Sequence, residues 1–424
     1  MMNNVSCKQS ENVIAYLQNE LNPEETSRFE CHLSGCSTCS KMFADSRLLM
    51  KQLKDVPTER PQTAIVDKVL NRIEAQPYQI QRRLGWVAAA AGILVAIIIG
   101  LVIISRQSTS STLALDKALD WLAHNQETSG KWSVEKWGGN RQYETALSGL
   151  SIMALMGSEE KERAKYNLNI QKGIEYLLDQ QSPEGRFGPM FNGALYNHGI
   201  ATTCLLEVAA LTKETKWDSS IKSALNYIRR TQTPSGGWGY LTLPNESPNT
   251  AASFWVLQAL VWGKAMGFKD VTPTLENGFQ WLARISDEQG RPGYRTKSDF
   301  PYGAETLSAM AAFCYTYGGA KYLPEPEKYQ CLLRNIPQQA LPIKDMNYYH
   351  LYFISYLEYP EISKWHEDMT KMLVRNQSNT NTLCGSWEAN DQWGQVGGRI
   401  YSTALATLTL EANNRRSWLK DCLK

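Results

Sequence analysis

One long apolar run divides the chain into a short first part and a long second part. The run extends from Gly85 to Ile104 and contains no charged side chain. A helix of this length rises about 30 Å, which matches the hydrocarbon core of a bilayer. The run therefore predicts a single transmembrane helix, with a buried core helix as the alternative. A cleaved signal peptide fits less well, because it would be expected at the extreme N-terminus.

After a polar linker at 105–112, a helical pattern recurs with a period of about fifty residues, which is typical of a repeat architecture. Each copy has an amphipathic helix, then a Gln, a Gly and an aromatic residue, and then a second helix. The first three copies carry Gln126, Gly130 and Trp132, Gln181, Gly185 and Phe187, and Gln232, Gly236 and Trp238. Later copies carry Ser286 and Tyr294, an eroded segment around Cys331, and finally Gln377, Gly385 and Trp387.

The second helix of each copy is apolar on nearly all sides, which is typical of a helix inside a fold. These segments include Thr145–Leu155, Ala201–Leu211, Thr250–Leu260, Thr306–Ala312 and Thr403–Leu410. Six outer and six inner helices predict an all-α fold with an (α/α)6 toroid at 113–424. Within each copy, we expect the Gln to bind carbonyls left open at the helix end, the Gly to permit the turn and the aromatic residue to pack over it.

The part before the apolar run contains a cluster of candidate metal ligands. Cys36 and Cys39 form a Cys-x-x-Cys pair, and His32 lies one helical turn earlier. With Cys7 they make a closed set of three thiolates and one imidazole, which suits structural zinc, although a chance cluster is the alternative. Cys31 competes for the fourth position, but it neighbours His32 and would face another way on a helix.

Short helices are predicted around these ligands. They cover Glu11–Leu21, a helix with Asn22 as N-cap and Pro23 at its first position, and a third helix from Cys39 to Leu53. Thr63–Glu74 forms a separate amphipathic helix. The predicted organisation is thus a zinc head at 1–55, a juxtamembrane segment at 56–84, the span at 85–104, the linker at 105–112 and the toroid at 113–424.

Charge indicates an orientation but no nucleic-acid partner. The 44 Lys and Arg nearly balance the 42 Asp and Glu, for a net charge of +2. Positive residues are denser before the apolar run than after it: Lys68, Arg72, Arg82 and Arg83 precede it, and Arg106 and Lys117 follow it. The positive-inside rule then places the head in the cytoplasm and the toroid outside. The later cysteines (Cys204, Cys314, Cys331, Cys384 and Cys422) show no paired spacing and are interpreted mostly as buried small apolar residues.

The head resembles the zinc-associated anti-sigma domain over roughly residues 5–75. The matching features are Cys7, Ala15-Tyr16-Leu17, Glu20-Leu21, Asn22-Pro23-Glu24-Glu25 and the spacing of His32, Cys36 and Cys39. The resemblance implies that these Cys and His residues hold zinc and that the helices, with Thr63–Glu74, clamp an extracytoplasmic-function sigma factor. It also implies a single-pass protein of the bacterial cytoplasmic membrane.

The repeat part resembles the squalene-cyclase and protein-prenyltransferase superfamily over nearly all of 110–424, which implies that the repeats are structural. The catalytic motifs of that superfamily are missing. No Asp-x-Asp-Asp run occurs in the chain, no Asp-x-Cys pair has a suitable later His, and Cys384-Gly385-Ser386-Trp387 departs from a thioester motif. We therefore expect a protein that is not an enzyme.

Polar residues at the starts of the inner helices are expected to converge on one mouth of the toroid. They are Tyr143, Glu144, His198, Asn249, Tyr302, Glu305, Tyr348, His350, Arg399 and Tyr401. As a group they predict a ligand cleft, although each alone fits N-capping or rim solvation. The preferred hypothesis is an anti-sigma-type regulator that senses an unknown ligand. The alternatives are a membrane-tethered terpene-cyclase-like or polysaccharide-active enzyme with Glu144 or Glu305 as acid, and a structural or interaction barrel.

Overall fold

A computed structural model describes residues 7, 10, 12–17, 21–54, 110–157, 160–241, 243, 245–301, 303–318, 320–322, 325–336, 347–358 and 362–423. The chain divides into two units, residues 1–98 and 99–424, and each is treated by itself below. The predicted span at 85–104 and the predicted helix at 63–74 lie outside the described residues. Within the described ranges, every helix is too short or too polar to span a bilayer.

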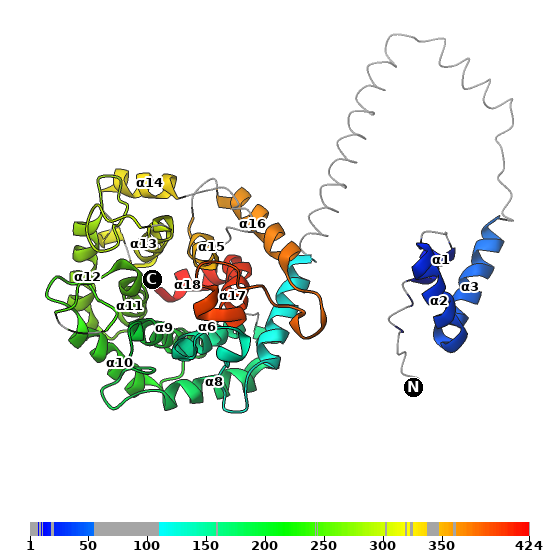
Figure 1. Ribbon diagram of the computed structural model, residues 1–424, viewed down its shortest axis with the longest axis horizontal. Helices are drawn as coiled ribbons and strands as arrows, with labels where there is room; N and C mark the ends of the chain where they lie inside the picture. Colours follow the sequence, from blue (N-terminus) through cyan, green and yellow to red (C-terminus); the bar gives the residue numbers. More distant parts are fainter. Residues whose placement is uncertain are drawn as a thin grey trace, which may run out of the picture. The chain divides into compact units, whose positions relative to one another are not determined.

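The first unit contains three short helices, α1 (Asn12–Leu17), α2 (Pro23–Gly35) and α3 (Ser37–Lys54) (Figure 1). The start of α2 is a capping box. The Asn22 side chain accepts from the backbone N–H of Glu25 at 2.9 Å, and the Glu25 carboxylate accepts from the N–H of Asn22 at 3.1 Å. The predicted N-cap is therefore confirmed. A small core of Val13, Phe29 and Cys39 joins the three helices.

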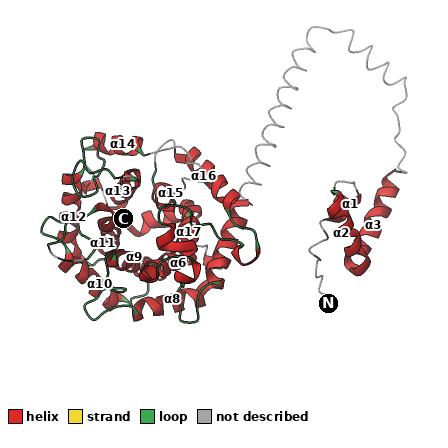
Figure 2. Ribbon diagram, viewed as in Figure 1, coloured by secondary structure: helices red, strands yellow, loops and turns green. Residues whose placement is uncertain are grey.

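The second unit is a ring of helices in two layers (Figures 1 and 2). The inner layer contains α6 (Glu144–Gly157), α9 (Ala194–Thr212), α11 (Thr250–Ala265), α13 (Ala304–Gly318), α15 (Tyr348–Ser355) and α17 (Gly394–Leu410). The outer layer contains a helix at 110–124 and α8 (Asn167–Asp179), α10 (Asp218–Thr231), α12 (Thr272–Ile285), α14 (Pro326–Asn335) and α16 (Ile362–Asn376). Each inner helix packs on the next, and α17 packs on α6, so the ring closes and the predicted α/α toroid is confirmed.

The recurring glycine is required by both its dihedral angle and its surroundings. Gly236 has φ of +98°, and a Cβ placed on it would lie 2.5 Å from the carbonyl oxygen of Asn277 in the next outer helix. Gly385 has φ of +97°, and a Cβ placed on it would lie 2.1 Å from the carbonyl oxygen of Lys117. Only glycine combines this backbone conformation with so close an approach. The repeat glycine therefore sets the distance between consecutive outer helices.

The recurring tryptophan, and not the glutamine, binds the open carbonyl at the end of the outer helix. The indole N–H of Trp132 donates to Leu122 O at 2.7 Å, and Trp238 donates to Ile228 O at 2.9 Å. Each accepting residue precedes the repeat glutamine by four positions. The prediction that the glutamine would cap the helix end is wrong, because the buried indole already occupies that carbonyl.

The glutamine instead connects one repeat to the next. The side-chain amide of Gln232 donates to Gly236 O in its own turn and to Thr274 O in the next outer helix, both at 2.8 Å. The other glutamines make equivalent pairs of bonds: Gln126 with Gly130 O and Asn169 O, Gln181 with Gly185 O and Ser220 O, and Gln377 with Gly385 O and Ala114 O. These bonds satisfy carbonyls of the turn and of the next helix's first turn.

The last of these bonds joins the end of the ring to its beginning. Gln377 lies directly after α16, and Ala114 belongs to the helix at 110–124; their hydrogen bond is 2.7 Å long. The indole N–H of Trp121 adds a bond to Thr382 O at 2.8 Å. The closure therefore uses the same chemistry as the other repeat junctions. Residues 110–112, the last of the predicted linker, are helical.

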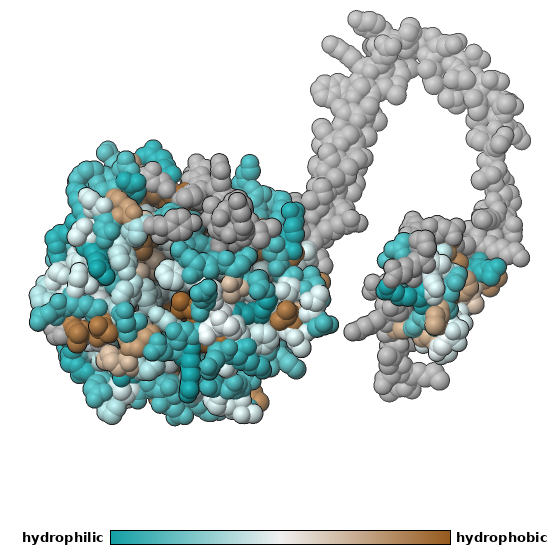
Figure 3. Space-filling view, viewed as in Figure 1, coloured by the Kyte–Doolittle hydropathy of each residue, from teal (hydrophilic) through white to brown (hydrophobic). Residues whose placement is uncertain are grey.

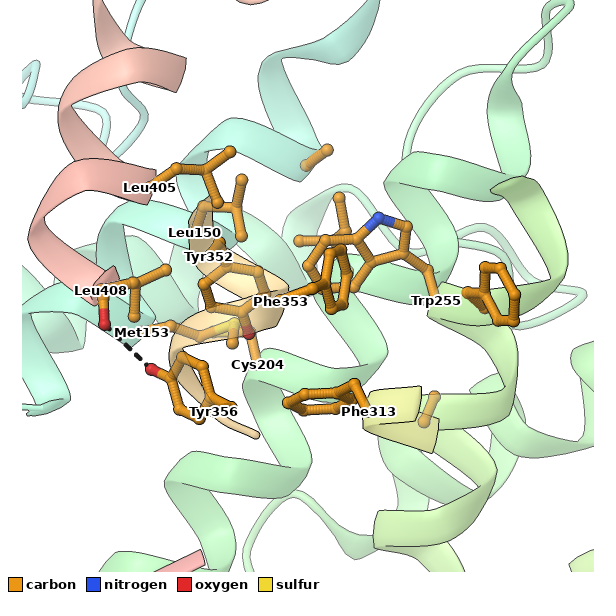
Figure 4. Packing of buried hydrophobic residues seen from close by; sticks show 14 of the residues in the cluster. Leu150, Met153, Cys204, Trp255, Phe313, Tyr352, Phe353, Tyr356, Leu405 and Leu408 are labelled. Atoms are coloured by element: carbon orange, nitrogen blue, oxygen red, sulfur yellow. Dashed lines mark hydrogen bonds between the residues drawn. The ribbon is translucent and has the colours of Figure 1, made fainter. Parts of the chain in front are cut away.

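The inner helices share one apolar core, seen from close by in Figure 4, where Leu150, Trp255 and Phe353 belong to three different helices. The hydroxyl of Tyr356 donates to Leu408 O at 3.0 Å and so satisfies a buried polar atom. The visible face of the toroid is largely hydrophilic, with only small apolar areas (Figure 3). The apolar residues of the repeats are thus mostly used between the layers.

A buried charge cluster interrupts this core near the C-terminal helix α18 (Ala412–Leu423). Arg415 and Glu207 are 0% and 1% exposed, and their Nη2 and Oε2 atoms lie 2.6 Å apart. Arg415 also donates to Met153 O at 2.9 Å. Glu411 lies nearby and is buried, and neither of its carboxylate oxygens has a hydrogen-bond partner in the described part of the chain. Burial raises the pKa of Glu411 well above its ordinary value.

Candidate metal centre and candidate ligand cavity

Four side chains of the head meet at one point. The ligand atoms of Cys7, His32, Cys36 and Cys39 all lie within 4.8 Å of one another. His32 Nε2 is 3.4 Å from the Sγ atoms of both Cys7 and Cys39. In a zinc tetrahedron with bonds of about 2.3 Å to sulfur and about 2.0 Å to nitrogen, the nitrogen-to-sulfur edge is about 3.5 Å. The four residues are therefore positioned to bind a metal ion, as predicted.

The local fold explains how these residues come together. His32 lies in the last turn of α2, Cys36 lies between α2 and α3, and Cys39 follows one turn into α3. Backbone N–H groups at the start of α3, first that of Cys39, lower the pKa of the Cys36 thiol and favour the thiolate that a metal requires. Cys31 is exposed and stands apart from the four, so the expectation that it faces another way is confirmed.

In the absence of a cation, the pKa of the Cys39 thiol is raised, in contrast to that of Cys36. Burial, followed by the neighbouring thiols of Cys7 and Cys36, raises the pKa of Cys39 to about 12. Three thiolates this close repel one another unless a divalent cation lies between them. With four protein ligands, a zinc ion here would have no open coordination position, which is the arrangement of a structural site.

One cavity of the toroid lies where the first turns of the inner helices converge. Its volume is about 370 Å³, which is within the range of small-molecule sites. Most of its lining is apolar or aromatic, and no Asp, Glu, Lys, Arg or His is among the described lining residues. The lining aromatic side chains are Tyr143, Tyr196, Tyr240, Tyr294, Tyr349, Trp393 and Tyr401. The cavity can therefore offer aromatic faces and hydroxyl groups, but no acid or base of its own.

These aromatic side chains form two groups of neighbouring rings. Tyr196 links Tyr143 and Tyr240, with centroid distances of 6.4 Å and 5.8 Å. The hydroxyls of Tyr240 and Tyr294 are in hydrogen-bond contact. Burial raises the pKa of Tyr143. Burial is also the largest cause that raises the pKa of Tyr294, followed by the hydrogen bond with Tyr240, so both phenols stay neutral.

Tyr349 is at the centre of the second group. Its ring centroid lies 5.3 Å from that of Tyr401 and 6.4 Å from that of Trp393. Tyr401 donates its hydroxyl to the Asp391 carboxylate at 2.7 Å. Asp391 also accepts from the backbone N–H groups of Tyr348 and Trp393. This carboxylate thus lies directly behind the cavity wall.

Of the ten predicted cleft residues, Tyr143 and Tyr401 line the cavity. Tyr302 lies outside the described residues, between Pro301 and Gly303, which both line it. Glu144 is buried and forms an ion pair with Lys131 at 3.0 Å. Glu305 is exposed at the start of α13 and is absent from the lining.

The remaining five have structural partners or lie in the core. Asn249 is the N-cap of α11, and Tyr348 donates to Glu388 O at 2.8 Å. Arg399 forms an ion pair with Glu388. His350 is buried, and burial lowers its pKa to about 4. The last of the five, His198, needs a closer comparison.

His198 occupies a repeated structural position. Its Nδ1 accepts from the backbone N–H of Phe187 at 3.1 Å. In other repeats, the hydroxyls of Ser148 and Ser253 accept from the N–H of the equivalent tryptophans at 3.1 Å and 2.9 Å. Burial lowers the pKa of His198 to about 3, so it stays neutral. His198 therefore orders a turn in its repeat.

Sequence reasoning did not place Tyr196, Tyr240, Tyr294, Tyr349 and Trp393 in the cleft, because it considered only selected polar residues at the predicted starts of the inner helices. Tyr240, Tyr294 and Trp393 lie in the loops before those helices. A usable signal was present. Tyr196 and Tyr349 stand in the first turns of apolar inner helices, where an aromatic residue with a hydroxyl group points to a half-polar wall.

The comparisons with known proteins divide in the same way as the chain. A family described as "Putative zinc-finger" matches residues 7–40. The squalene–hopene cyclase of Bradyrhizobium diazoefficiens is 24% identical over 205 residues, which cover 42% of this chain and 29% of that enzyme. The squalene–hopene cyclase of Zymomonas mobilis is 25% identical over 164 residues, which cover 37% of this chain and 23% of that enzyme. The chain thus spans less than a third of either cyclase.

Solved structures resemble the toroid more completely. The alpha-1,6-mannanase of Salegentibacter sp. HEL1_6 aligns with 73% of this chain and 99% of its own, at a TM-score of 0.54 and 12% identity. A type II terpene cyclase variant from Scytonema, bound to its product, aligns with 74% of this chain and 99% of its own. The TM-score is 0.50 and the sequence identity is 14%. At such low identity, the likeness establishes the fold alone.

Proposed function

We propose that this protein is a single-pass membrane regulator of the anti-sigma type. The cytoplasmic zinc head binds an extracytoplasmic-function sigma factor, and the toroid is a ligand-binding sensor on the other side of the bacterial cytoplasmic membrane. The observation that carries the proposal is the closed set of four metal ligands in a head of three short helices. A metal site without an open position supports a binding surface and not a reaction.

The surface of the head also supports a partner. Ile14, Met42 and Leu48 are 50%, 40% and 58% exposed, in a unit whose own core is small. Large apolar side chains are unfavourable in water, and burying them against a protein partner lowers the free energy. The apolar run from Gly85 to Ile104 and the positive residues before it support the membrane span and its orientation.

The cavity supports a sensing role for the toroid. It is large enough for a small molecule, and its described lining has no carboxylic acid. General acid catalysis on an alkene or a glycoside needs a carboxyl group positioned at the substrate. A binding role therefore fits this wall better than the two enzymatic alternatives do.

The second candidate, a cyclase-like or polysaccharide-active enzyme, is favoured by the fold and by the partial sequence similarity to squalene–hopene cyclases. One of the mannanase structures is an inactive variant in which two neighbouring aspartates are replaced. This chain contains no two neighbouring aspartates. Glu144, one of the two candidate acids, is in an ion pair with Lys131, and Glu305, the other, is exposed and is not among the described lining residues.

Co-purification tests the head. The full chain is expressed together with the extracytoplasmic-function sigma factors of its own organism, one at a time, and is purified in detergent micelles. We expect one of these sigma factors to co-purify with the chain, and we expect Cys36→Ser to abolish this by removing a metal ligand. Cys31→Ser is the matched control, because that thiol is exposed and outside the ligand set. If neither the parent nor the control retains any of these sigma factors, the anti-sigma role is rejected.

A further inference from the structure

The aromatic cavity of the toroid has an electrostatic character that selects among ligand classes. Seven aromatic side chains line it, in the two groups described above, and their ring faces carry negative electrostatic potential. No cationic side chain is among the described lining residues. The guanidinium of Arg295 lies over the Tyr294 ring at 5.5 Å, but Arg295 is exposed and is not part of the lining.

Two carboxylates lie behind this wall. Asp391 receives the hydroxyl of Tyr401 at 2.7 Å, and Glu246 receives the backbone N–H of Tyr240 at 2.7 Å and that of Leu241 at 2.8 Å. Within the described part of the chain, neither carboxylate is in an ion pair, whereas Glu144 at the same end of the ring is paired with Lys131. The group around Tyr349 therefore has a carboxylate without a paired cation behind it, whereas the group around Tyr196 has both Glu246 and the exposed Arg295 beside it.

Hydrogen bonding to a carboxylate strengthens the effect at Tyr401. A phenol that donates to an anion has a more electron-rich ring, because the hydroxyl becomes more polarised toward the carboxylate. The Tyr401 ring belongs to the cavity wall. Asp391 also holds the backbone at Trp393: its carboxylate accepts from the N–H of Trp393, and its backbone carbonyl accepts from the N–H of Gly394. The wall is thus rigid, aromatic and negative in potential.

We infer that the cavity binds an organic cation with a quaternary ammonium group. Such a group cannot donate hydrogen bonds, so it loses little by leaving water for a wall of aromatic faces. An anion would be repelled by Asp391 and Glu246, and a neutral ligand such as a sugar would gain nothing from the carboxylates behind the wall. The inference rests on the proposed ligand-binding role of the toroid and specifies the ligand's class.

Calorimetric titration of the full chain in detergent micelles tests the inference. The probes are choline and benzyltrimethylammonium, each compared with the neutral carbon isostere in which carbon replaces the charged nitrogen. The isosteres have the same shape and apolar area, so only the charge differs. We expect each cation to bind at least about tenfold more tightly than its isostere.

Two variants at one position separate ring faces from packing. Tyr196→Leu removes an aromatic face but keeps apolar bulk, and it should weaken binding of the cation about fivefold to thirtyfold. Tyr196→Phe keeps the face and should change affinity less than twofold. Tyr166→Phe, a tyrosine bonded to Asp120 on the outer layer, is the control for the substitution itself. Thermal melting of each variant shows whether it is folded.

Asp391→Asn tests the charge behind the wall. It preserves the shape and should lower the affinity for the cation while leaving the affinity for the isostere unchanged. Equal or tighter binding of the isosteres overturns the cation inference but retains a ligand-binding toroid. If no probe binds to a folded chain, the inference is wrong, and the role of the head is still decided by its own co-purification experiment.

Discussion

The buried pair of Arg415 and Glu207 allows a quantitative prediction. Arg415→Met keeps an unbranched side chain of similar length and removes the charge. In the parent, both groups are almost completely inaccessible to solvent and the two charged atoms are 2.6 Å apart. Removing one partner leaves Glu207 buried without a cation and Met153 O without its donor. Breaking such a pair typically costs about 3–5 kcal/mol.

The expected cost depends on pH, and its sign follows from Glu207. Burial raises the pKa of Glu207, and Arg415 opposes that increase. Without Arg415, the pKa in the folded state rises further above the unfolded value. The folded variant then binds more protons than the unfolded chain, so its free energy of unfolding falls as pH rises from the unfolded pKa of Glu207 towards its raised folded value. The destabilisation should be smaller at the acid end.

Urea unfolding of the full chain measures this effect. Tryptophan fluorescence reports on the toroid, because every tryptophan except Trp86 lies in it. The double variant Glu207→Gln with Arg415→Met should recover part of the loss, since the uncompensated charge is gone. Two results would refute the reasoning. One is a free energy of unfolding for the single variant within about 1 kcal/mol of that of the parent at pH 8; the other is a double variant that is no more stable than the single one.

Three further predictions concern the metal centre, the repeat junctions and the unpaired acid. Cys36→Ser should lose bound zinc, measured by elemental analysis after dialysis, while Cys31→Ser keeps it; equal zinc contents would contradict the assigned ligands. Gln232→Leu removes two hydrogen bonds and should lower the free energy of unfolding by about 1–3 kcal/mol. Glu411→Gln should stabilise the chain at pH 8 and flatten its stability profile, because the raised pKa of Glu411 makes the parent lose stability as pH rises. An unchanged profile would contradict the last prediction.

The architecture of the toroid could be predicted because its information is local and repeated. A helix pattern, a glycine and an aromatic residue recur in each copy, so an error in one copy is corrected by the others. The metal centre could be predicted for a related reason, since His32, Cys36 and Cys39 lie within two helical turns. Only Cys7 required a long-range assumption.

The roles of individual side chains were harder to predict. The repeat Gln and Trp both carry N–H donors near the same helix end, and the order of residues does not determine which carbonyl each one reaches. In the structure, the large buried indole takes the nearer carbonyl and the longer amide bridges to the next repeat. His198 was misleading in a similar way, because its ring replaces a serine or threonine hydroxyl that has an ordinary structural role.

The cavity wall could not be assembled from the sequence because its residues come from six inner helices and the loops before them. Tyr240 and Tyr294 are 54 positions apart and meet through their hydroxyls. The rings of Tyr349 and Tyr401 come from different inner helices, α15 and α17, and their centroids lie 5.3 Å apart. Such contacts depend on the ring geometry, which a periodic pattern predicts only in outline.

The junction between Gln377 and Ala114 has a mechanical consequence. An open solenoid can be pulled at one end and unfold one repeat at a time, but in this ring the first helix is also the neighbour of the last. A tensile force on the chain before residue 110 would act directly on this junction, where the bonds from Gln377 to Ala114 O and from Trp121 to Thr382 O resist it. Breaking those bonds would release the first outer helix from the last repeat, while the packing of α17 on α6 would still hold the inner layer closed. The place where the chain enters the toroid is therefore also the place where the outer layer would open first under such a force.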